Sequence, residues 1–219
     1  MIEFLKTLTD PESIIRYGGL WLLLFVIFAE TGLFFGFFLP GDNLILIAGI
    51  ISATHPEWFM NLPFPVVALL MILAAILGNS AGYWFGQKLG HRIFEKEDTL
   101  FFKKKHLVQT RIFYDKYGSL TLIAGRFIPI VRTFAPILAG VINVPKKTFL
   151  IYNIAGAVLW IGSLGSVAFF LGTYYAEWIE ENIKYVFIAL IIITALPIVI
   201  TSIRQKIKHN SEEKEKAES

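Results

Sequence analysis

The sequence contains no cysteine, which excludes disulfide bonds and thiolate chemistry, whether catalytic or metal-binding. The histidines lie far apart in the chain and form no spacing typical of a metal site, so we expect neither a metal nor a cofactor; they are His55, His91, His106 and His209. Charged residues make up only 17% of the chain, hydrophobic residues make up 55%, and the mean hydropathy is +0.62. A chain with so little polar surface is typical of polytopic membrane proteins.

Three apolar segments are long enough to cross a bilayer as helices, at residues 64–86, 149–172 and 185–203. Each comes near the ~20 residues that a hydrocarbon core of ~30 Å requires. The expected fold class is therefore an all-α polytopic membrane protein. The tryptophans, Trp160 among them, fall mostly near the expected membrane interfaces and need no ligand to explain them.

The lysines and arginines predict the orientation of these segments. Residues 91–118 and the tail 204–219 are rich in basic residues, so both should be cytoplasmic. The first of these interleaves apolar residues with lysines, which suits an amphipathic helix on an anionic inner leaflet. The loop 52–63 has no Lys or Arg and the loop 173–184 is acidic, so both should face outward. The N-terminal segment 1–16 carries balanced charges that do not indicate a side.

Residues 119–142 should begin and end on the cytoplasmic side, because basic residues flank them and the next helix must emerge at an outer loop. A segment that does not cross has to enter the membrane and return. Pro129, Pro136 and Gly140 are the expected breaks in this re-entrant hairpin. Irregular backbone at membrane depth is tolerated only beside protein or a water-filled cavity, so the hairpin implies a polar cavity.

A second apolar stretch, residues 20–51, also does not fit a single transmembrane helix, because of its length. As one helix it would be ~48 Å long at 1.5 Å per residue, too long for one span and too short for two. Gly36, Pro40 and Gly41 near its centre are typical of a turn. We therefore expect a second re-entrant hairpin, opening toward the outside.

The two hairpins end in similar sequences, Leu-Ile-Ala-Gly-Ile-Ile at 46–51 and Ile-Leu-Ala-Gly-Val-Ile at 137–142. Each hairpin precedes a glycine-bearing span. This self-similarity favours an inverted repeat, with a first half at 17–90 and a second at 119–172. Inverted repeats whose broken helices meet at the bilayer midplane are the architecture of secondary transporters.

Both hairpins carry ionisable residues, acidic in the first (Glu30 and Asp42) and basic in the second (Arg126 and Arg132). A charge at bilayer depth costs several kcal/mol unless it is paired or hydrated, so each is a candidate functional residue. The planar fork of arginine suits bidentate recognition of phosphate, which makes the arginines candidate substrate-binding residues. The alternative is that the arginines merely neutralise the acids. Both can hold, because a carboxylate displaced from an arginine by an anionic substrate would tend to take up a proton.

Two strings of residues carry a family resemblance. Glu30 to Asp42 read E-T-G-x3-G-x3-P-G-D, and Gly125 to Gly140 read G-R-x2-P-x2-R-x3-P-x2-A-G. Together they resemble the DedA family, also called the SNARE-associated or VTT-domain family, over about residues 17 to 172. The resemblance implies two facing re-entrant loops and a role in handling lipids. Bacterial members are implicated in recycling undecaprenyl phosphate across the cytoplasmic membrane and in dependence on the proton-motive force.

The positions that are essential in that family correspond to the four charged residues above, Glu30, Asp42, Arg126 and Arg132. We therefore expect a transporter or flippase of a lipid phosphate, with undecaprenyl phosphate the first candidate, driven by the proton-motive force. It should reside in the bacterial plasma membrane with its C-terminus in the cytoplasm. Expected partners are the lipid-phosphate substrate, membrane lipids and protons but no nucleic acid, and the sequence leaves a homo-oligomer open.

Two alternative functions remain. One is a proton- or cation-coupled small-solute transporter in pH or osmotic homeostasis, although two arginines do not suit a pathway for cations. The other is a phospholipid scramblase. An enzyme acting on lipid phosphates is disfavoured, because the sequence lacks the paired histidine motifs of lipid phosphatases and the aspartate cluster of CDP-alcohol transferases.

Overall fold

The computed structural model describes residues 11–32, 41–89, 111–112, 114–182 and 185. Within these ranges the chain consists of helices and short connections without a β-strand, which confirms the predicted all-α class. Several predicted features lie outside the described residues, namely Gly36, Pro40, most of the cytoplasmic segment 91–118, nearly all of the span 185–203, and the tail. The chain divides after Tyr174 into two compact units. In the second unit the structure describes one short helix, α10 (Ala176–Glu181).

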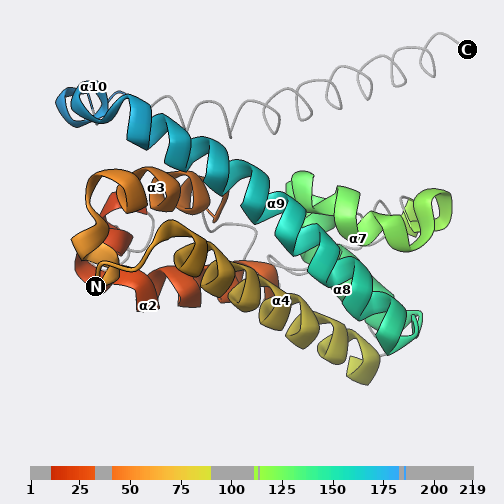
Figure 1. Cartoon of the computed structure of the whole chain (residues 1–219). Coiled ribbons are helices and arrows are strands. Elements are labelled where there is room, and N and C mark those ends of the chain that lie inside the picture. Colours follow the sequence, from red (N-terminus) through yellow and green to blue (C-terminus); the bar gives the residue numbers. More distant parts are fainter. Residues whose placement is uncertain (1–10, 33–40, 90–110, 113, 183–184, 186–219) are drawn as a thin grey trace, which may run out of the picture. The chain divides into compact units, whose positions relative to one another are not determined.

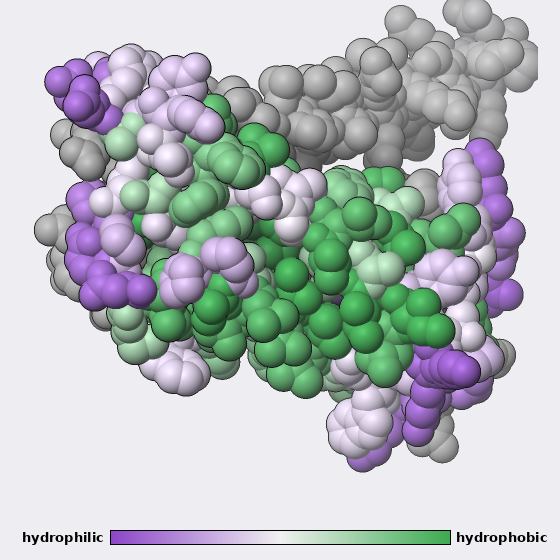
Figure 2. Space-filling view, in the orientation of Figure 1, coloured by the Kyte–Doolittle hydropathy of each residue, from purple (hydrophilic) through white to green (hydrophobic). Residues whose placement is uncertain are grey.

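Two helices of the first unit are long and apolar enough to cross a membrane, α4 (Phe64–Leu89) and α9 (Lys146–Tyr174). They contain the predicted segments 64–86 and 149–172 and run a few residues further. At 1.5 Å per residue they are ~39 and ~44 Å long, which exceeds a hydrocarbon core of ~30 Å. Large apolar side chains line their outer faces, such as Leu73 and Leu77 on α4 and Val158 and Leu159 on α9. Figure 2 shows a broad hydrophobic area in the central part of the side of the molecule that it presents.

Helices α4 and α9 pack in opposite directions. The ring of Phe64 at the start of α4 stacks on Phe169 near the end of α9, with 4.6 Å between ring centroids. The ring of Tyr83 near the end of α4 stacks on Phe149 near the start of α9, at 4.2 Å. Two long antiparallel helices therefore form the frame against which the shorter elements pack (Figure 1).

The first predicted hairpin comprises α2 (Pro11–Gly32) and α3 (Gly41–Thr54), which contact each other. Helix α2 is kinked at Gly19, whose φ of 54° is a left-handed conformation that favours glycine. The kink lies next to Leu20, where the predicted hairpin begins. A short 3₁₀ helix, η2 (Pro56–Phe59), follows α3 before α4 begins.

The second predicted hairpin is broken into η3 (Gly118–Leu120), α7 (Thr121–Ala124), η4 (Gly125–Phe127) and α8 (Pro129–Val141). The break predicted at Pro129 is present, because Ile128 is extended (φ −119°, ψ 109°) and Pro129 opens α8. A proline at the first position of a helix has no hydrogen bond to lose.

The breaks predicted at Pro136 and Gly140 are wrong, because α8 continues through both residues. Proline inside a helix costs one backbone hydrogen bond, but residues 131 to 141 of α8 are all buried, and their packing offsets that loss. Gly140 instead allows close packing, because a Cβ there would collide with the backbone oxygen of Tyr83 on α4.

The short helices pack in a crossed pattern. Helix α2 lies against α4 and α7 against α9, so the first arm of each hairpin contacts the long helix that follows it in sequence. Helix α3 lies against α9 and α8 against α4, so each second arm contacts the long helix of the other half. At Gly49 of α3 a Cβ would lie only 2.6 Å from the Gly165 oxygen of α9, which is the same role that Gly140 has on α8. The glycines of the two similar hexamers thus make equivalent contacts.

Candidate functional site

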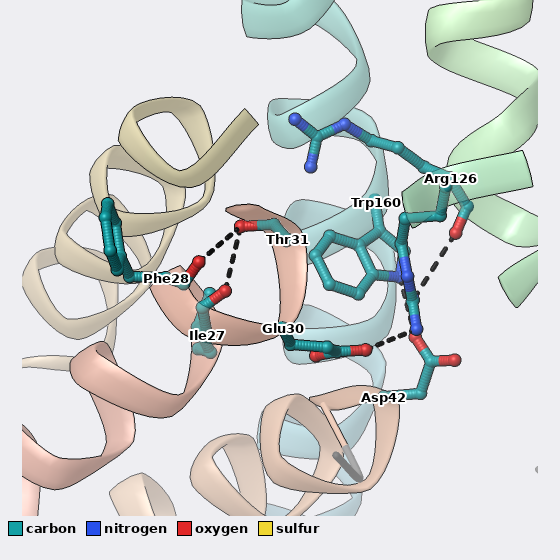
Figure 3. Close-up of polar contacts among 8 residues, drawn as sticks. Ile27, Phe28, Glu30, Thr31, Asp42, Arg126 and Trp160 are labelled. Carbon is teal, nitrogen blue, oxygen red and sulfur yellow. Dashed lines mark hydrogen bonds and ion pairs between the residues drawn. The ribbon is translucent and has the colours of Figure 1, made fainter. Parts of the chain in front are cut away.

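The four charged residues predicted from the sequence come together inside the first unit. Glu30 stands in the last turns of α2, Asp42 in the first turn of α3, Arg126 in η4 and Arg132 in α8. Glu30, Arg126 and Arg132 are buried, whereas the Asp42 side chain is 28% exposed. All four therefore lie at or near the ends of helices, and the site forms where these ends come together (Figure 3).

Arg132 is paired with both acids. Its Nη2 donates to Glu30 Oε1 at 2.5 Å and its Nη1 donates to Asp42 Oδ1 at 2.6 Å. One guanidinium thus joins α2 to α3 through a charge-assisted contact on each side. The alternative raised from the sequence, that an arginine neutralises the acids, describes the geometry of Arg132.

The Glu30 carboxylate lies directly against the backbone of Gly41. A Cβ at Gly41 would overlap Oε2 of Glu30, so any other residue there would force the carboxylate to shift from its position beside Arg132. Among the described residues, Glu30 Oε2 has no hydrogen-bond partner. Gly41 is therefore required by the site, in addition to opening α3.

Arg126 has a different environment. Its Nη2 donates to the side-chain oxygen of Asn153 at 2.6 Å and to the Asn153 backbone oxygen at 3.2 Å. Its Nε and Nη1 have no hydrogen-bond partner within the described part of the chain, nor is an ion pair of Arg126 found there. Figure 3 shows its side chain extending away from Glu30 and Asp42. Arg126 is thus a buried cation, 1% exposed, with unused donors.

Trp160 of α9 completes the site, a role that the sequence did not indicate. Its Nε1 donates to Asp42 Oδ1 at 2.9 Å, and its ring centroid lies 4.7 Å from Cζ of Arg132 and 5.7 Å from Cζ of Arg126. The side chain is buried among the residues of the site, a set of contacts that the general expectation for tryptophans at membrane interfaces does not include. An aromatic face beside two guanidinium groups stabilises their positive charge without removing it.

Asn153 is the other residue whose role the sequence did not indicate. It is fully buried, and besides accepting from Arg126 its Nδ2 donates to the Ile76 backbone oxygen of α4 at 3.1 Å. A buried amide that bonds both a backbone group and a cation is held in one orientation. The available signal was an asparagine within a membrane-length helix that is mostly apolar.

Comparison with known proteins gives one family. A VTT domain model matches residues 39–167. "Protein DedA" of Escherichia coli is 35% identical over 198 residues, which cover 89% of this chain and 88% of that protein. An uncharacterized membrane protein of Mycobacterium tuberculosis is 35% identical over 183 residues, covering 83% and 78%. One of Synechocystis is 31% identical over 167 residues, covering 76% and 73%. No solved structure matches.

Proposed function

We propose, from the premise that the chain belongs to the DedA family of VTT-domain membrane proteins, that it is a transporter of a lipid phosphate. It carries its substrate between the leaflets of a bacterial plasma membrane, with its C-terminus in the cytoplasm, and uses the proton-motive force. Undecaprenyl phosphate is the first candidate substrate. The process contains no covalent step, so the protein is not an enzyme.

The observation that carries this proposal is the state of Arg126. A buried guanidinium with unused donors is costly unless an anion completes its coordination. Phosphate matches the geometry of the guanidinium fork and offers several acceptor oxygens. The lipid-facing surfaces of α4 and α9 flank the helices that carry the site, which suits a substrate with a charged head and an apolar tail.

Two features support an inverted repeat with two facing re-entrant hairpins. Helices α3 and α8 are apolar but only 14 and 13 residues long, or ~21 and ~20 Å, too short to cross a core of ~30 Å. The crossed packing, with equivalent roles for Gly49 and Gly140, relates the two halves element by element. Broken helices with a charged site at their ends are a common design of secondary transporters.

Proton coupling would use the two acids of the Arg132 network. When the phosphate of the substrate attracts Arg132, a carboxylate loses its partner inside a low-dielectric site and gains affinity for a proton. Substrate and proton then favour each other's binding by the same factor. Glu30 is the stronger candidate for the proton carrier, because it is fully buried and one of its oxygens has no partner among the described residues.

The transport assay uses the purified protein in lipid vesicles that contain undecaprenyl phosphate, with undecaprenol as the neutral control. An inward proton gradient should accelerate movement of the phosphate between leaflets and leave undecaprenol unaffected. Gradient-independent movement of ordinary phospholipids would instead indicate the scramblase. Gradient-driven flux of a small solute or cation, without movement of the phosphate, would indicate the small-solute transporter.

The re-entrant arrangement can be tested by cysteine labelling, since the natural chain has no cysteine and needs no prior substitution. Ala53→Cys, near the end of α3, should react with an impermeant thiol reagent added outside. Lys146→Cys, at the start of α9, should react only from the cytoplasmic side. Labelling of position 146 from outside would contradict the proposal, because residues 119–142 would then have crossed the bilayer.

A further inference from the structure

The two long helices carry the same short pattern at the point where they approach Arg126. Helix α4 has Asn79-Ser80-Ala81-Gly82, and α9 has Asn153-Ile154-Ala155-Gly156, both of the form Asn-x-Ala-Gly. Both asparagines are buried, Asn79 at 2% and Asn153 at 0% exposure, and their side chains are 3.0 Å apart. Two amides, one from each long helix, thus lie beside one guanidinium.

The hydrogen bonds determine how the Asn79 amide is oriented. With its nitrogen toward Asn153, that nitrogen would also face Arg126 Nη2, which places two donors together. Rotated by 180°, the amide nitrogen donates to the Thr31 backbone oxygen of α2 at 3.0 Å, and its oxygen accepts from Arg126 Nη2 at 2.9 Å. The rotation gives up the bond to Asn153 Oδ1 and leaves the two amide oxygens 3.0 Å apart, with the Arg126 nitrogen as their shared donor. In this orientation both asparagine oxygens accept from the same nitrogen of Arg126.

Gly156 provides the space for this arrangement. A Cβ at that position would lie 3.0 Å from both Cδ and Nε of Arg126, so the arginine stem passes directly over the glycine. Asn153 stands one helical turn earlier on the same face of α9 and receives the guanidinium. On α9, Gly156 therefore leaves room for the Arg126 side chain, and Asn153 fixes the position of its guanidinium group.

We propose that Asn79 and Asn153 are positioning residues that hold Arg126 apart from Glu30 and Asp42, leaving its charge and remaining donors for a phosphate. The inference rests on the proposed function. The chemical reason is that an amide oxygen accepts a hydrogen bond without neutralising the cation, whereas a carboxylate would cancel its charge and compete with the phosphate. Asparagine is the residue that can orient Arg126 and leave it positive.

The decisive variant is Asn153→Asp, which keeps the shape of the side chain and the oxygen that accepts from Arg126 but adds a carboxylate. It loses the hydrogen bond that the amide donates to the Ile76 backbone oxygen, and a new ion pair with Arg126 would offset that loss. If the amides merely fill space, Asn153→Asp should be tolerated, since it gives Arg126 a counter-charge. If they keep Arg126 available, the affinity for a phosphate lipid should fall about tenfold or more while the thermal stability stays equal or rises. Asn79→Asp is the second variant, because it places a carboxylate on the same nitrogen. Asn61→Asp, an exposed position outside the long helices, is the matched control and should keep wild-type affinity.

Binding of undecaprenyl phosphate and of dodecyl phosphate to the full-length protein would be measured by native mass spectrometry, with undecaprenol as the uncharged probe, beside thermal unfolding. Reduced affinity in Asn153→Asp or Asn79→Asp at undiminished stability supports the inference. Wild-type affinity in both overturns the inference alone. If both variants lose affinity only together with stability, the inference is also overturned, because the asparagines would then be structural. If the wild type binds neither phosphate, the proposed function fails and the inference falls with it.

Discussion

Arg126 and Arg132 are close in the sequence, belong to the same hairpin and are both buried, yet their surroundings are opposite. Arg132 lies between two carboxylates and its charge is neutralised. Arg126 is held by neutral amides and keeps its charge. The extended residue Ile128 between them, which interrupts the helix, allows the two side chains to diverge.

Two residues of one type, in one motif, therefore have separate tasks. The Arg132 network joins α2, α3 and α8 and so bears on folding. Arg126 makes no described contact with an acid, so its removal should spare the fold and affect the ligand. The motif contains two arginines for two acids, but the contacts do not pair them one to one.

The largest expected effect follows from Arg132→Leu. Removing this arginine leaves Glu30 and Asp42 close together without a counter-charge, which should lower the free energy of unfolding by about 3–5 kcal/mol. The change in stability is measured by thermal unfolding in detergent. The control is the triple variant with Glu30→Gln and Asp42→Asn added, which should regain most of the loss. Wild-type stability of Arg132→Leu would show that the network does not hold the fold together.

Arg126→Gln should have the opposite pattern of effects, with stability retained and ligand affinity reduced. The melting temperature should stay near that of the wild type, whereas the affinity for undecaprenyl phosphate should fall about 10- to 100-fold, as expected for losing a charge-assisted contact of ~1.5–3 kcal/mol. Arg126→Lys should also bind weakly, because an ammonium cannot reproduce the planar fork. Native mass spectrometry and thermal unfolding together test the comparison. Arg126→Lys with full activity would reduce the role of Arg126 to its charge.

Glu30→Gln should separate binding from coupling. The variant keeps a hydrogen-bond acceptor for Arg132 but cannot exchange a proton, so it should still bind undecaprenyl phosphate and lose the acceleration by an inward proton gradient. Flux in vesicles with and without the gradient measures this. Asp42→Asn is the matched variant at the more exposed acid. If both variants respond to the gradient as the wild type does, neither acid carries the proton.

The smallest effect is expected for Trp160→Phe. The phenyl ring keeps an aromatic face toward Arg132 but loses the Nε1 hydrogen bond to Asp42, a change of about 1 kcal/mol or less than tenfold in affinity. Trp160→Leu removes the aromatic face as well. It should therefore bind undecaprenyl phosphate more weakly than Trp160→Phe in the same measurement. Equal affinities in the two variants would mean that the ring contributes packing only.

Length and hydropathy were sufficient to predict α4 and α9, because a 20-residue apolar run has few other structures open to it. The four charged residues were predicted as a set for a similar reason, since isolated charges are rare in such runs. The break expected at Pro136 is absent because the effect of a proline on a helix depends on its tertiary surroundings, and α8 is buried over the whole of residues 131 to 141.

The different surroundings of Arg126 and Arg132 could not be predicted from the sequence. It depends on which helix of the other half lies beside each guanidinium, and on whether that helix offers a carboxylate or an amide. The roles of Trp160 and Asn153 were missed for the same reason. Tryptophan is common at membrane interfaces and asparagine in a long apolar helix gives no partner by itself, so only packing identifies what they do.

The crossed packing also has a consequence for how the protein is made. Helix α3 rests on α9, and the ribosome synthesises α9 only after the residues from Thr54 to Lys146 have been added. At ~5–20 residues per second this takes about 5 to 20 s, a period in which α3 can pack against α2, η2 and α4 but lacks its contacts with α9. The packing of α3 is therefore completed only when α9 has been made, and a chain truncated before α9 should be less stable and more readily degraded than the full chain.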